Sequence, residues 1–394
     1  MAITDKEKGV WGLDQVYNKI NQGSIWEYNG PLGLMVVGEA SILAQNDNVN
    51  RSSPVQIPGT TWTSSSTDRS IGATSHYSGS VTAVKTDGTL WGWGSNGKGQ
   101  FGQNNTIPVS SPIQIPGTNW KQTTNGYRTT HAVKTDGTLW SAGYGEYGAL
   151  ANNLSGNPGS RSSPIQIPGT TWKSVAAHGY AVSAIKTDGT LWAWGLNEAG
   201  GLGQNNKGPS GKYSSPRQIP GTTWKACHGG YSSIAGVKTD GTLWAWGSNV
   251  FGQLGDNSRT QRSSPIQIPG TNWAACAMDV AAVAVKTDGT LWTWGRNNYG
   301  QNGQNGSVNA HYSSPVQIGS STDWNTGEKT LATSNGTSAA MKTDGTLWMF
   351  GRNVYGNYGI NDTVSYSSPV QVGSDFTEVT LPYEGNSRFS MQTQ

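Results

Sequence analysis

The chain has 394 residues, of which 55 are glycine and 18 are tryptophan, and charged residues make up 12%. This composition is typical of neither a disordered chain nor a helical one, because the many indole rings can build a large core. The 26 basic and 23 acidic residues leave a formal net charge of +3 without a basic block, so nucleic acid is not favoured as a partner.

Neither an export signal nor a membrane span is expected. The start, MAITDKEKGVWGL, has no apolar core after a basic end, and no apolar run approaches the length of a transmembrane helix. Cys227 and Cys276 each lie three residues after a repeated tryptophan, so they occupy equivalent positions. We expect buried free thiols, with a disulfide as the alternative, in a protein that folds inside a cell.

Residues 10–28, VWGLDQVYNKINQGSIWEY, differ from the rest of the chain and are expected to form a short helix. Four apolar residues follow the i, i+3, i+4, i+7 spacing of one helix face, and Gly23 can end the helix. An isolated helix of this length is marginal in water, so it needs a partner surface. That surface is either a face or rim of the domain formed by the rest of this chain, which is predicted below to be a propeller, or another protein. The candidate anchor residues are Trp11, Leu13, Val16, Tyr17, Ile20 and Trp26.

The same tract resembles the pattern Gly-[Val/Ile]-Trp-x-Leu…Tyr…Gly-x-Trp near the N-terminus of many tailed-phage virion proteins. Glu27 departs from it, since proline often follows the last tryptophan there. The resemblance implies that residues 1–30 anchor the chain to another virion protein, with residues 31–394 as a separate domain.

Six copies of KTDGTLW recur after residue 80, at steps of 48 to 56 residues, which indicates a repeat architecture. Asp-Gly between two apolar runs predicts a β-hairpin, because glycine accepts the positive φ of a tight turn. Trp244 and Trp246 are two residues apart and share one face of the second strand, and Leu243 takes the other. Such a strand must be covered on both faces.

Seven copies of Ser-Ser-Pro-[Val/Ile/Arg]-Gln-[Ile/Val] indicate another strand, with proline at its start. Since proline lacks a donor, this strand is expected at the outer edge of a sheet, opening at Pro54, Pro112, Pro164 and their equivalents. In most repeats PGT[TN]W then predicts a turn and a strand led by tryptophan. Each unit therefore has about four strands and no helix, and radial stacking into a propeller would cover both faces of each sheet.

Sixteen of the 18 tryptophans occupy these repeat positions. Each buries roughly 200 Å² and contributes up to about 5 kcal/mol before entropy is counted, at about 25 cal/mol per Å². We therefore interpret the tryptophans as core rather than as binding residues.

The ends of the chain explain why the sequence has seven Ser-Ser-Pro motifs but only six KTDGTLW motifs. PLGLMVVGEA places Leu34, Met35, Val37 and Gly38 where other repeats have Leu, Trp, Trp and Gly, and SRFSMQTQ matches the strand before the hairpin turn. One blade is thus expected to form from both termini, which removes open sheet edges. The prediction is an all-β, seven-bladed β-propeller of four-stranded antiparallel blades, closed by pairing of its N- and C-terminal strands and preceded by the short helix.

GTLWAWGSNVFGQLGDN, residues 241–257, with its recurring spacing to SSPxQI and tryptophan, resembles the regulator of chromosome condensation repeat family. The resemblance covers residues 31–394 and implies a seven-bladed propeller with a protein-binding face made of loops. Its members include a nucleotide-exchange factor, a plant ultraviolet photoreceptor and a bacterial inhibitor of β-lactamases, so fold does not decide function. The photoreceptor's Gly-Trp-Arg-His-Thr loop is absent here, and the uniform repeats look like those of bacterial and marine phage genomes.

The loops just before the KTD hairpins vary most and are rich in Tyr, His and Arg, which suits protein or glycan contacts. The candidate rim residues are His76, Tyr77, Tyr127, Arg128, His178, Tyr180, His228, Tyr231, Asp279, Asn335 and Tyr383. Histidines in equivalent loops of separate blades diverge around the axis, so no metal site is expected. No phosphate-binding loop or nucleophile elbow appears, and we expect no cofactor and no catalysis.

We therefore expect a non-enzymatic virion structural protein, decorating a capsid, neck or tail, in contact with other virion proteins and with a host-surface glycan or protein. The alternative is a soluble protein-binding propeller that inhibits or regulates a partner. A carbohydrate-active enzyme on the same scaffold is the third hypothesis.

Overall fold

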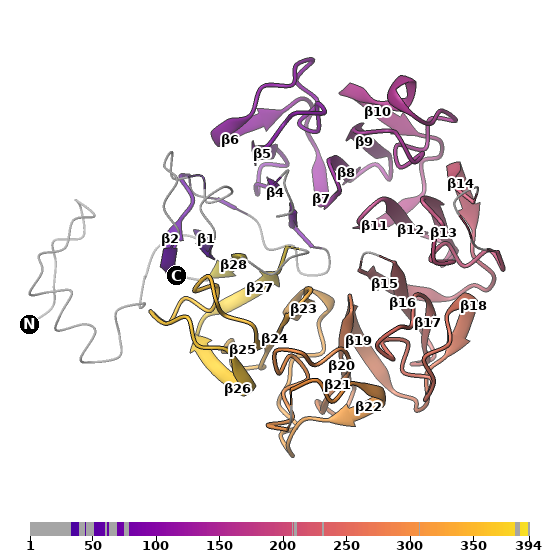
Figure 1. Ribbon diagram of the computed structural model, residues 1–394. Helices are drawn as coiled ribbons and strands as arrows, with labels where there is room; N and C mark the ends of the chain where they lie inside the picture. Colours follow the sequence, from indigo (N-terminus) through magenta and orange to yellow (C-terminus); the bar gives the residue numbers. More distant parts are fainter. Residues whose placement is uncertain are drawn as a thin grey trace, which may run out of the picture.

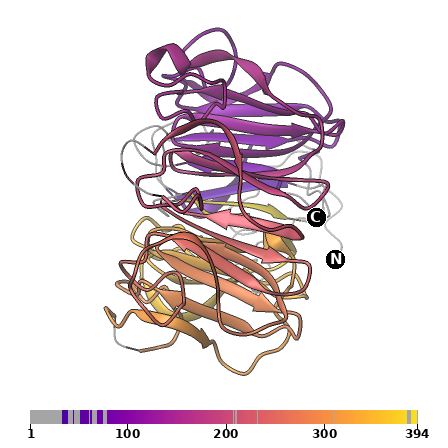
Figure 2. The same cartoon turned by 90° about the vertical axis from the view of Figure 1, so that its right-hand side faces the viewer.

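The computed structural model describes residues 33–38, 44, 51–59, 61–62, 69–74, 79–206, 208, 211–230, 232–306, 308–382 and 387–392. Within these residues, β-strands form seven four-stranded antiparallel sheets around a central axis (Figure 1). The view turned by 90° shows the blades from the side (Figure 2). The predicted seven-bladed propeller is confirmed.

Every blade has the same order of strands from the axis outward. The innermost strands of blades 1 to 7 are β3 (Ile71–Thr74), β7 (Trp120–Gly126), β11 (Trp172–His178), β15 (Trp224–Gly229), β19 (Trp273–Met278), β23 (Leu331–Thr333) and β27 (Phe376–Thr380). The second strands are β4 (Ser80–Val84), β8 (Thr129–Lys134), β12 (Ala181–Lys186), β16 (Ser233–Lys238), β20 (Ala281–Lys286), β24 (Thr337–Met341) and β28 (Ser387–Gln392).

The two remaining strands complete each blade on its outer side. The third strands are β5 (Leu90–Gly94), β9 (Leu139–Gly143), β13 (Leu191–Gly195), β17 (Leu243–Gly247), β21 (Leu291–Gly295), β25 (Leu347–Gly351) and β1 (Gly33–Gly38). The outer strands are β6 (Val109–Ile115), β10 (Arg161–Ile167), β14 (Tyr213–Gln218), β18 (Arg262–Gln267), β22 (Tyr312–Gln317), β26 (Tyr366–Gly373) and β2 (Arg51–Gln56).

The KTDGTLW segment forms the predicted hairpin, and its polar residues build a repeated unit. In blade 4, Gly241 takes a φ of 78° in the turn between β16 and β17. The Asp240 carboxylate accepts hydrogen bonds from the Thr242 N–H at 2.9 Å and the Thr242 hydroxyl at 2.7 Å. The Trp244 indole N–H donates to the same hydroxyl at 2.9 Å. The turn therefore holds the half-buried indole in place.

The other tryptophan of the motif joins neighbouring blades. Trp246 is fully buried, and its indole N–H donates to the Gly201 carbonyl of blade 3 at 2.9 Å. Its ring centroid lies 5.8 Å from that of Trp224, in an edge-to-face arrangement. Leu243, on the opposite face of β17, packs with Trp273 and Trp294 of blade 5. The predicted covering of both faces is thus confirmed.

The outer strands lie at the sheet edges, as predicted from their proline, but they begin three residues earlier. In blade 2, β10 starts at Arg161, which pairs with Gly143, and the register shifts before pairing resumes at Ile165. Pro164 lies within this shift. The irregularity removes the need for a proline N–H in the ladder, so the strand extends past the point that proline alone predicts.

Blade 7 is closed by the two ends of the chain, and its strand order is β2-β1-β28-β27. β1 and β28 pair without interruption from Gly33 opposite Gln392 to Gly38 opposite Ser387. Where the other blades have a hairpin turn between their second and third strands, this blade joins separate chain segments. The predicted closure is confirmed.

Short helices were not expected in the repeats, yet two 3₁₀ turns occur in the described part of the chain: η2 (Asn157–Gly159) and η3 (Glu328–Thr330). Each lies in an insertion relative to the regular repeat. No helix of the described residues has the length and hydropathy of a membrane span. The predicted helix within residues 10–28, with all its anchor residues, lies outside the described residues.

The seam between blade 7 and blade 1 contains a buried carboxylate. Glu378 on β27 accepts hydrogen bonds from the Ser70 N–H and hydroxyl at 2.9 and 2.6 Å, and from the Ile71 N–H at 3.2 Å. Gln122 occupies the equivalent position in blade 2 and bonds the N–H and C=O of Val175 in blade 3. A polar side chain at this position therefore ties two innermost strands together.

Replacing Thr242 with valine is expected to lower the free energy of unfolding by about 1–2 kcal/mol, because Asp240 and the Trp244 indole both lose a hydrogen-bond partner. Urea denaturation would measure the change. Thr190→Val in the identical unit of blade 3 is the matched variant and should lose a similar amount. A loss confined to one of the two blades would contradict a common role for the turn.

Replacing Glu378 with glutamine isolates the pH dependence of the seam. Burial raises the pKa of the Glu378 carboxyl above its usual 4.5, although Ser70 and Arg69 oppose the shift. The folded state then holds a proton that the unfolded state releases, so this group weakens folding as pH rises from about 4.5 through the folded-state pKa. Glutamine does not titrate, and the stability of Glu378→Gln relative to wild type should therefore increase over that range in denaturation series. A flat or falling difference would show that Glu378 is not destabilised by burial.

Candidate functional site

The two sides of the disc differ in the loops that they present. Because antiparallel strands alternate in direction, the loops joining first to second strands and third to fourth strands emerge on one side. We call this side the loop face. The KTDGTLW turns and the linkers between blades lie on the opposite side, which we call the turn face. Sequence differences between repeats concentrate on the loop face.

Three tyrosines of blades 2 and 3 form one cluster on the loop face. The Tyr180 ring centroid lies 4.6 Å from that of Tyr127 and 4.5 Å from that of Tyr147. The Arg128 guanidinium lies 5.0 Å from the Tyr127 ring centroid, and all four side chains are half-buried. The Tyr127 N–H donates to the Gly179 carbonyl at 2.7 Å, which holds the loops of the two blades together. We name Tyr127, Arg128, Tyr147 and Tyr180 the tyrosine cluster.

Blades 4 to 6 carry a second group of aromatic and basic side chains. The Arg296 guanidinium lies 5.1 Å from the Phe251 ring centroid and donates to the Asn335 side-chain oxygen at 2.6 Å. The Arg352 guanidinium lies 5.5 Å from the Tyr299 ring centroid and 5.2 Å from that of Tyr355. Loops of three blades are therefore linked through arginine. We name the group the arginine cluster; it comprises Phe251, Arg296, Tyr299, Asn335, Arg352 and Tyr355.

Exposed apolar side chains accompany the arginine cluster. Val250 is 65% exposed, Val354 is 47% exposed and Tyr299 is 38% exposed. All three lie in loops between third and fourth strands. Large apolar groups beside arginine and aromatic rings are the composition of protein-binding surfaces.

The electrostatic environment beside the arginine cluster is positive. Partial burial lowers the pKa of His311 below its usual 6.5, and the charges of Arg259 and Arg296 lower it further. The Asn297 N–H donates to His311 Nδ1 at 3.1 Å, which requires that nitrogen to be unprotonated. His311 is thus neutral at pH 7, and the positive charge of this sector comes from its arginines.

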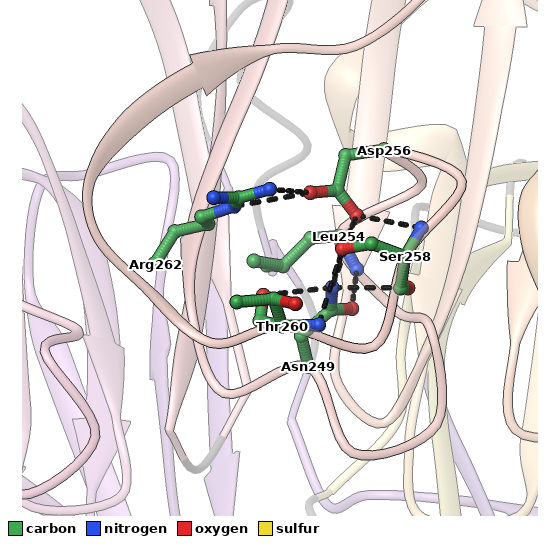
Figure 3. A network of polar contacts seen from close by, with 6 residues as sticks. All are labelled: Asn249, Leu254, Asp256, Ser258, Thr260 and Arg262. Carbon is green, nitrogen blue, oxygen red and sulfur yellow. Dashed lines mark hydrogen bonds and ion pairs between the residues drawn. The ribbon is translucent and has the colours of Figure 1, made fainter.

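Buried asparagines hold the loops that present these side chains. In blade 4, Asn249 accepts from the Leu254 N–H at 2.9 Å and donates to Asp256, to the Ser258 carbonyl and to the Thr260 carbonyl (Figure 3). Asp256 also accepts from Arg262 at 2.9 Å. The same bond, in which the backbone N–H five residues later donates to the asparagine side-chain oxygen, recurs in other blades at Asn96, Asn197, Asn297 and Asn353. The loop face is therefore preorganised.

The network also determines the charge of Asp256. Burial by itself would raise the pKa of this carboxyl, but hydrogen bonds from Ser258, Arg262 and Asn249 bring the pKa below its usual value. Asp256 is therefore ionised at neutral pH, and its ion pair with Arg262 closes the loop (Figure 3).

The predicted rim residues do not all gather at one place. Tyr127, Arg128 and Tyr180 meet in the tyrosine cluster, and Asn335 binds Arg296. Asp279 is only 3% exposed, and its backbone N–H donates to the Ala281 carbonyl within the loop, so it adds little to the accessible surface. His228 lines the axial cavity rather than the rim. His76, Tyr77, Tyr231 and Tyr383, and the side chain of His178, lie outside the described residues.

Sequence reasoning missed Tyr147, Phe251, Arg296, Tyr299, Arg352 and Tyr355. They follow the third strand, in the segment whose motif carries the family resemblance, and no binding role was predicted for it. The signal available in the sequence was the variation between repeats at the x positions of the GxNxxG motif. The candidate rim was predicted from the loops before the KTD hairpins instead. Those loops and the loops after the third strands both lie on the loop face.

The described residues contain no group of three or more His, Cys, Asp or Glu side chains placed to hold a metal ion. Cys227 and Cys276 are buried free thiols, as predicted. Burial raises the pKa of the Cys227 thiol to about 12 and also raises that of Cys276. A thiol with a raised pKa is a poor nucleophile at neutral pH.

Comparison with protein families identifies the repeats. The model described as regulator of chromosome condensation (RCC1) repeat matches residues 87–133, 188–235 and 240–283, and a second model of this repeat matches residues 281–301. The chain therefore contains RCC1 repeats, which confirms that part of the resemblance. The comparisons do not show the likeness of residues 10–28 to tailed-phage virion proteins.

Curated relatives match only part of this chain. The human E3 ubiquitin-protein ligase HERC2 is 28% identical over 176 residues, which cover 43% of this chain and 4% of the ligase. The ultraviolet-B receptor UVR8 of Arabidopsis thaliana is 28% identical over 177 residues, covering 43% of this chain and 40% of the receptor. The match thus spans less than half the length of either relative.

Solved structures share the whole fold at low sequence identity. Human WBSCR16 superposes with a TM-score of 0.78 at 15% identity, covering 93% of this chain and all of that one. Prp20p of Saccharomyces cerevisiae superposes with a TM-score of 0.73 at 16% identity, covering 92% of each chain. These likenesses establish the fold.

Replacing Asn249 with alanine is expected to lower the free energy of unfolding by about 1–3 kcal/mol and to loosen residues 248–261, because the Leu254 N–H and the loop carbonyls lose their buried partner. Chemical denaturation and limited proteolysis of this loop would measure both effects. Arg259→Ala, an exposed change in the same loop, should alter stability by less than about 0.5 kcal/mol. Equal effects of the two variants would contradict the role given to Asn249.

Proposed function

We propose that this RCC1-repeat propeller is a non-enzymatic protein-binding module that engages its partner through the loop face. The observation that carries the proposal is the arginine cluster, in which two arginines, three aromatic rings and exposed valines from three blades form one surface. Arginine and aromatic residues dominate the energetics of protein interfaces. Because the asparagine networks hold the loops in place, binding requires little ordering of this surface.

The nature of the compared proteins supports binding of a protein rather than catalysis. One structure of Prp20p is described together with its binding properties to Gsp1p and histones. A second structure shows Kap60 bound to Prp20. One relative is a ligase, but its match spans only 4% of that protein. In this chain the turn aspartates are engaged by threonine, and both thiols are buried. An inhibitor or regulator of a partner protein fits these observations best.

A virion structural role is a second proposal, and it rests on the sequence of residues 1–30 and on the uniformity of the repeats. In that case the N-terminal tract attaches the propeller to another virion protein, and the protein is located in the virion. Deleting residues 1–30 would test this proposal directly. Loss of the chain from purified particles, with the propeller still folded, would support it, and unchanged incorporation would contradict it.

Paired charge-removing variants test the use of the loop face. Arg296→Ala with Arg352→Ala should weaken capture of the protein's partners from its native source at least tenfold, because the arginines link the clustered loops and carry their charge. Quantitative cross-linking mass spectrometry would identify the captured proteins and the residues in contact.

The matched control removes two positive charges from the exposed outer edge of blade 3, through Lys212→Ala with Arg217→Ala. Its capture of partners should stay within about threefold of wild type. Loss of capture in this control, with normal capture by the loop-face variant, would overturn the proposal. Cross-links confined to the turn face would do the same, and strong binding to a glycan array in the absence of any protein partner would favour an adhesin.

A further inference from the structure

The innermost strands of all seven blades enclose a cavity along the propeller axis. Its volume is about 580 Å³, and described residues of β3, β7, β11, β15, β19, β23 and β27 line it. Pockets that bind small ligands have volumes of roughly 300–1,000 Å³. The axial cavity is therefore large enough for a small molecule, and it is separate from the loop-face clusters.

The charged residues that line this cavity are mostly basic. Four are cationic, namely Arg69, Lys121, Lys173 and Lys225, and Glu328 is the one carboxylate among the described lining residues. Four positive charges against one negative charge leave the described lining residues with a charge of +3 when His228 is neutral. Since the whole chain also carries only +3, the cavity concentrates positive charge far above the average of the protein.

Three of the cations come from the same position of neighbouring blades. Lys121, Lys173 and Lys225 each follow the tryptophan that begins the innermost strand of blades 2, 3 and 4. The backbone N–H of each of these tryptophans donates to a glycine carbonyl in the hairpin turn of the preceding blade, at 2.9 to 3.0 Å. The lysines are thereby placed at the turn-face end of the cavity. Blade 5 has Ala274 at this position, and its carbonyl accepts from Lys225 Nζ at 3.1 Å.

Arg69 provides a fixed cation from the other side of the axis. Its guanidinium donates to the carbonyls of Glu328 and Leu331 in blade 6, at 2.9 and 2.6 Å, and to that of Val379 in blade 7 at 3.2 Å. These three acceptors are neutral carbonyl groups, so the bonds orient the guanidinium, while the Glu378 and Glu328 carboxyl groups nearby partly offset its charge. Burial lowers its pKa from the usual 12.5, while Glu378 and Glu328 oppose the shift.

Charge is distributed unevenly along the axis. Arg69, the three lysines and Glu328 all stand at or before the starts of innermost strands, on the turn-face side. Toward the loop face the lining is neutral, with Ala177, Met278 and Leu381 among its residues. An anion in the cavity is therefore drawn to the turn-face end, where the lysines and Arg69 face each other across the axis.

We propose that the turn-face half of the axial cavity binds a compact anion that carries several phosphate groups. Lysine ammonium groups are compact charges that bind phosphate oxygens, and Arg69 adds a planar donor. Because the cations come from several blades, a polyphosphate can contact more than one of them at once, which a compact anion with a single charged group cannot do. Lys173 and Lys225 are exposed and Lys121 is half-buried, so these side chains are accessible to an anion that enters from the turn face.

Isothermal titration of the full chain with tripolyphosphate tests the proposal. Wild type should bind at physiological ionic strength, and the variant Lys121→Gln/Lys173→Gln/Lys225→Gln should bind at least tenfold more weakly. The control Lys98→Gln/Lys212→Gln/Arg259→Gln removes three positive charges from positions outside the cavity and should stay within about threefold of wild type. Arg296→Ala with Arg352→Ala should also bind normally, which separates this site from the proposed function of the loop face.

Several results would overturn the proposal. Absence of binding by wild type at millimolar tripolyphosphate would remove it, and equal weakening in the control would show a non-specific response to net charge. Equally tight binding of citrate would show that phosphate is not the group recognised. If the triple variant does not fold, as judged by its unfolding midpoint, the single variant Lys173→Gln still decides, because Lys173 is exposed; its affinity should fall measurably, and unchanged affinity would contradict the site.

Discussion

Burial of indole rings between adjacent sheets is the interaction on which this structure depends. Each four-stranded sheet is too small to cover its own apolar faces, and it does so only by packing against the next sheet around the axis. Trp246 illustrates the constraint, since it is fully buried and bonded to a carbonyl of the preceding blade. No blade has a complete core of its own, and closure of the ring supplies the last interface.

The seam of the ring meets the same constraint with different residues. Blade 7 has Phe376 where most blades have tryptophan, and its two central strands come from opposite ends of the chain. Glu378 accepts a hydrogen bond from the Ser70 N–H at the start of blade 1. At the equivalent position of blade 2, Gln122 accepts one from the Val175 N–H of blade 3. A charged group in this position adds a pH-dependent contribution that a glutamine cannot make. The point where the ring closes therefore also contributes to the pH dependence of its stability.

Identical residues of the repeats build the scaffold, and departures from the repeat supply the candidate sites. The turn aspartates, the buried asparagines and the tryptophans recur in most blades and are explained by packing. Arg296 and Arg352 occur at a position where the other blades have serine, tyrosine, leucine or glutamate, and Lys121, Lys173 and Lys225 occupy only three blades. Two distinct surfaces result, one on the loop face and one along the axis. A regular scaffold thus allows a few substitutions to create local chemistry without disturbing the fold.

The sequence by itself determined the elements and their number. Asp-Gly turns, period-two alternation and proline positions act over a few residues, and the strand-like ends of the chain indicated how the seventh blade closes. The tertiary structure decided which variable residues meet. Tyr147 approaches Tyr180 across a blade boundary, Arg69 reaches carbonyls some 260 and 310 residues away in the chain, and Asp279 turns inward although its loop reaches the loop face. Local patterns carry no information on these contacts, because they depend on how separate blades are oriented around one axis.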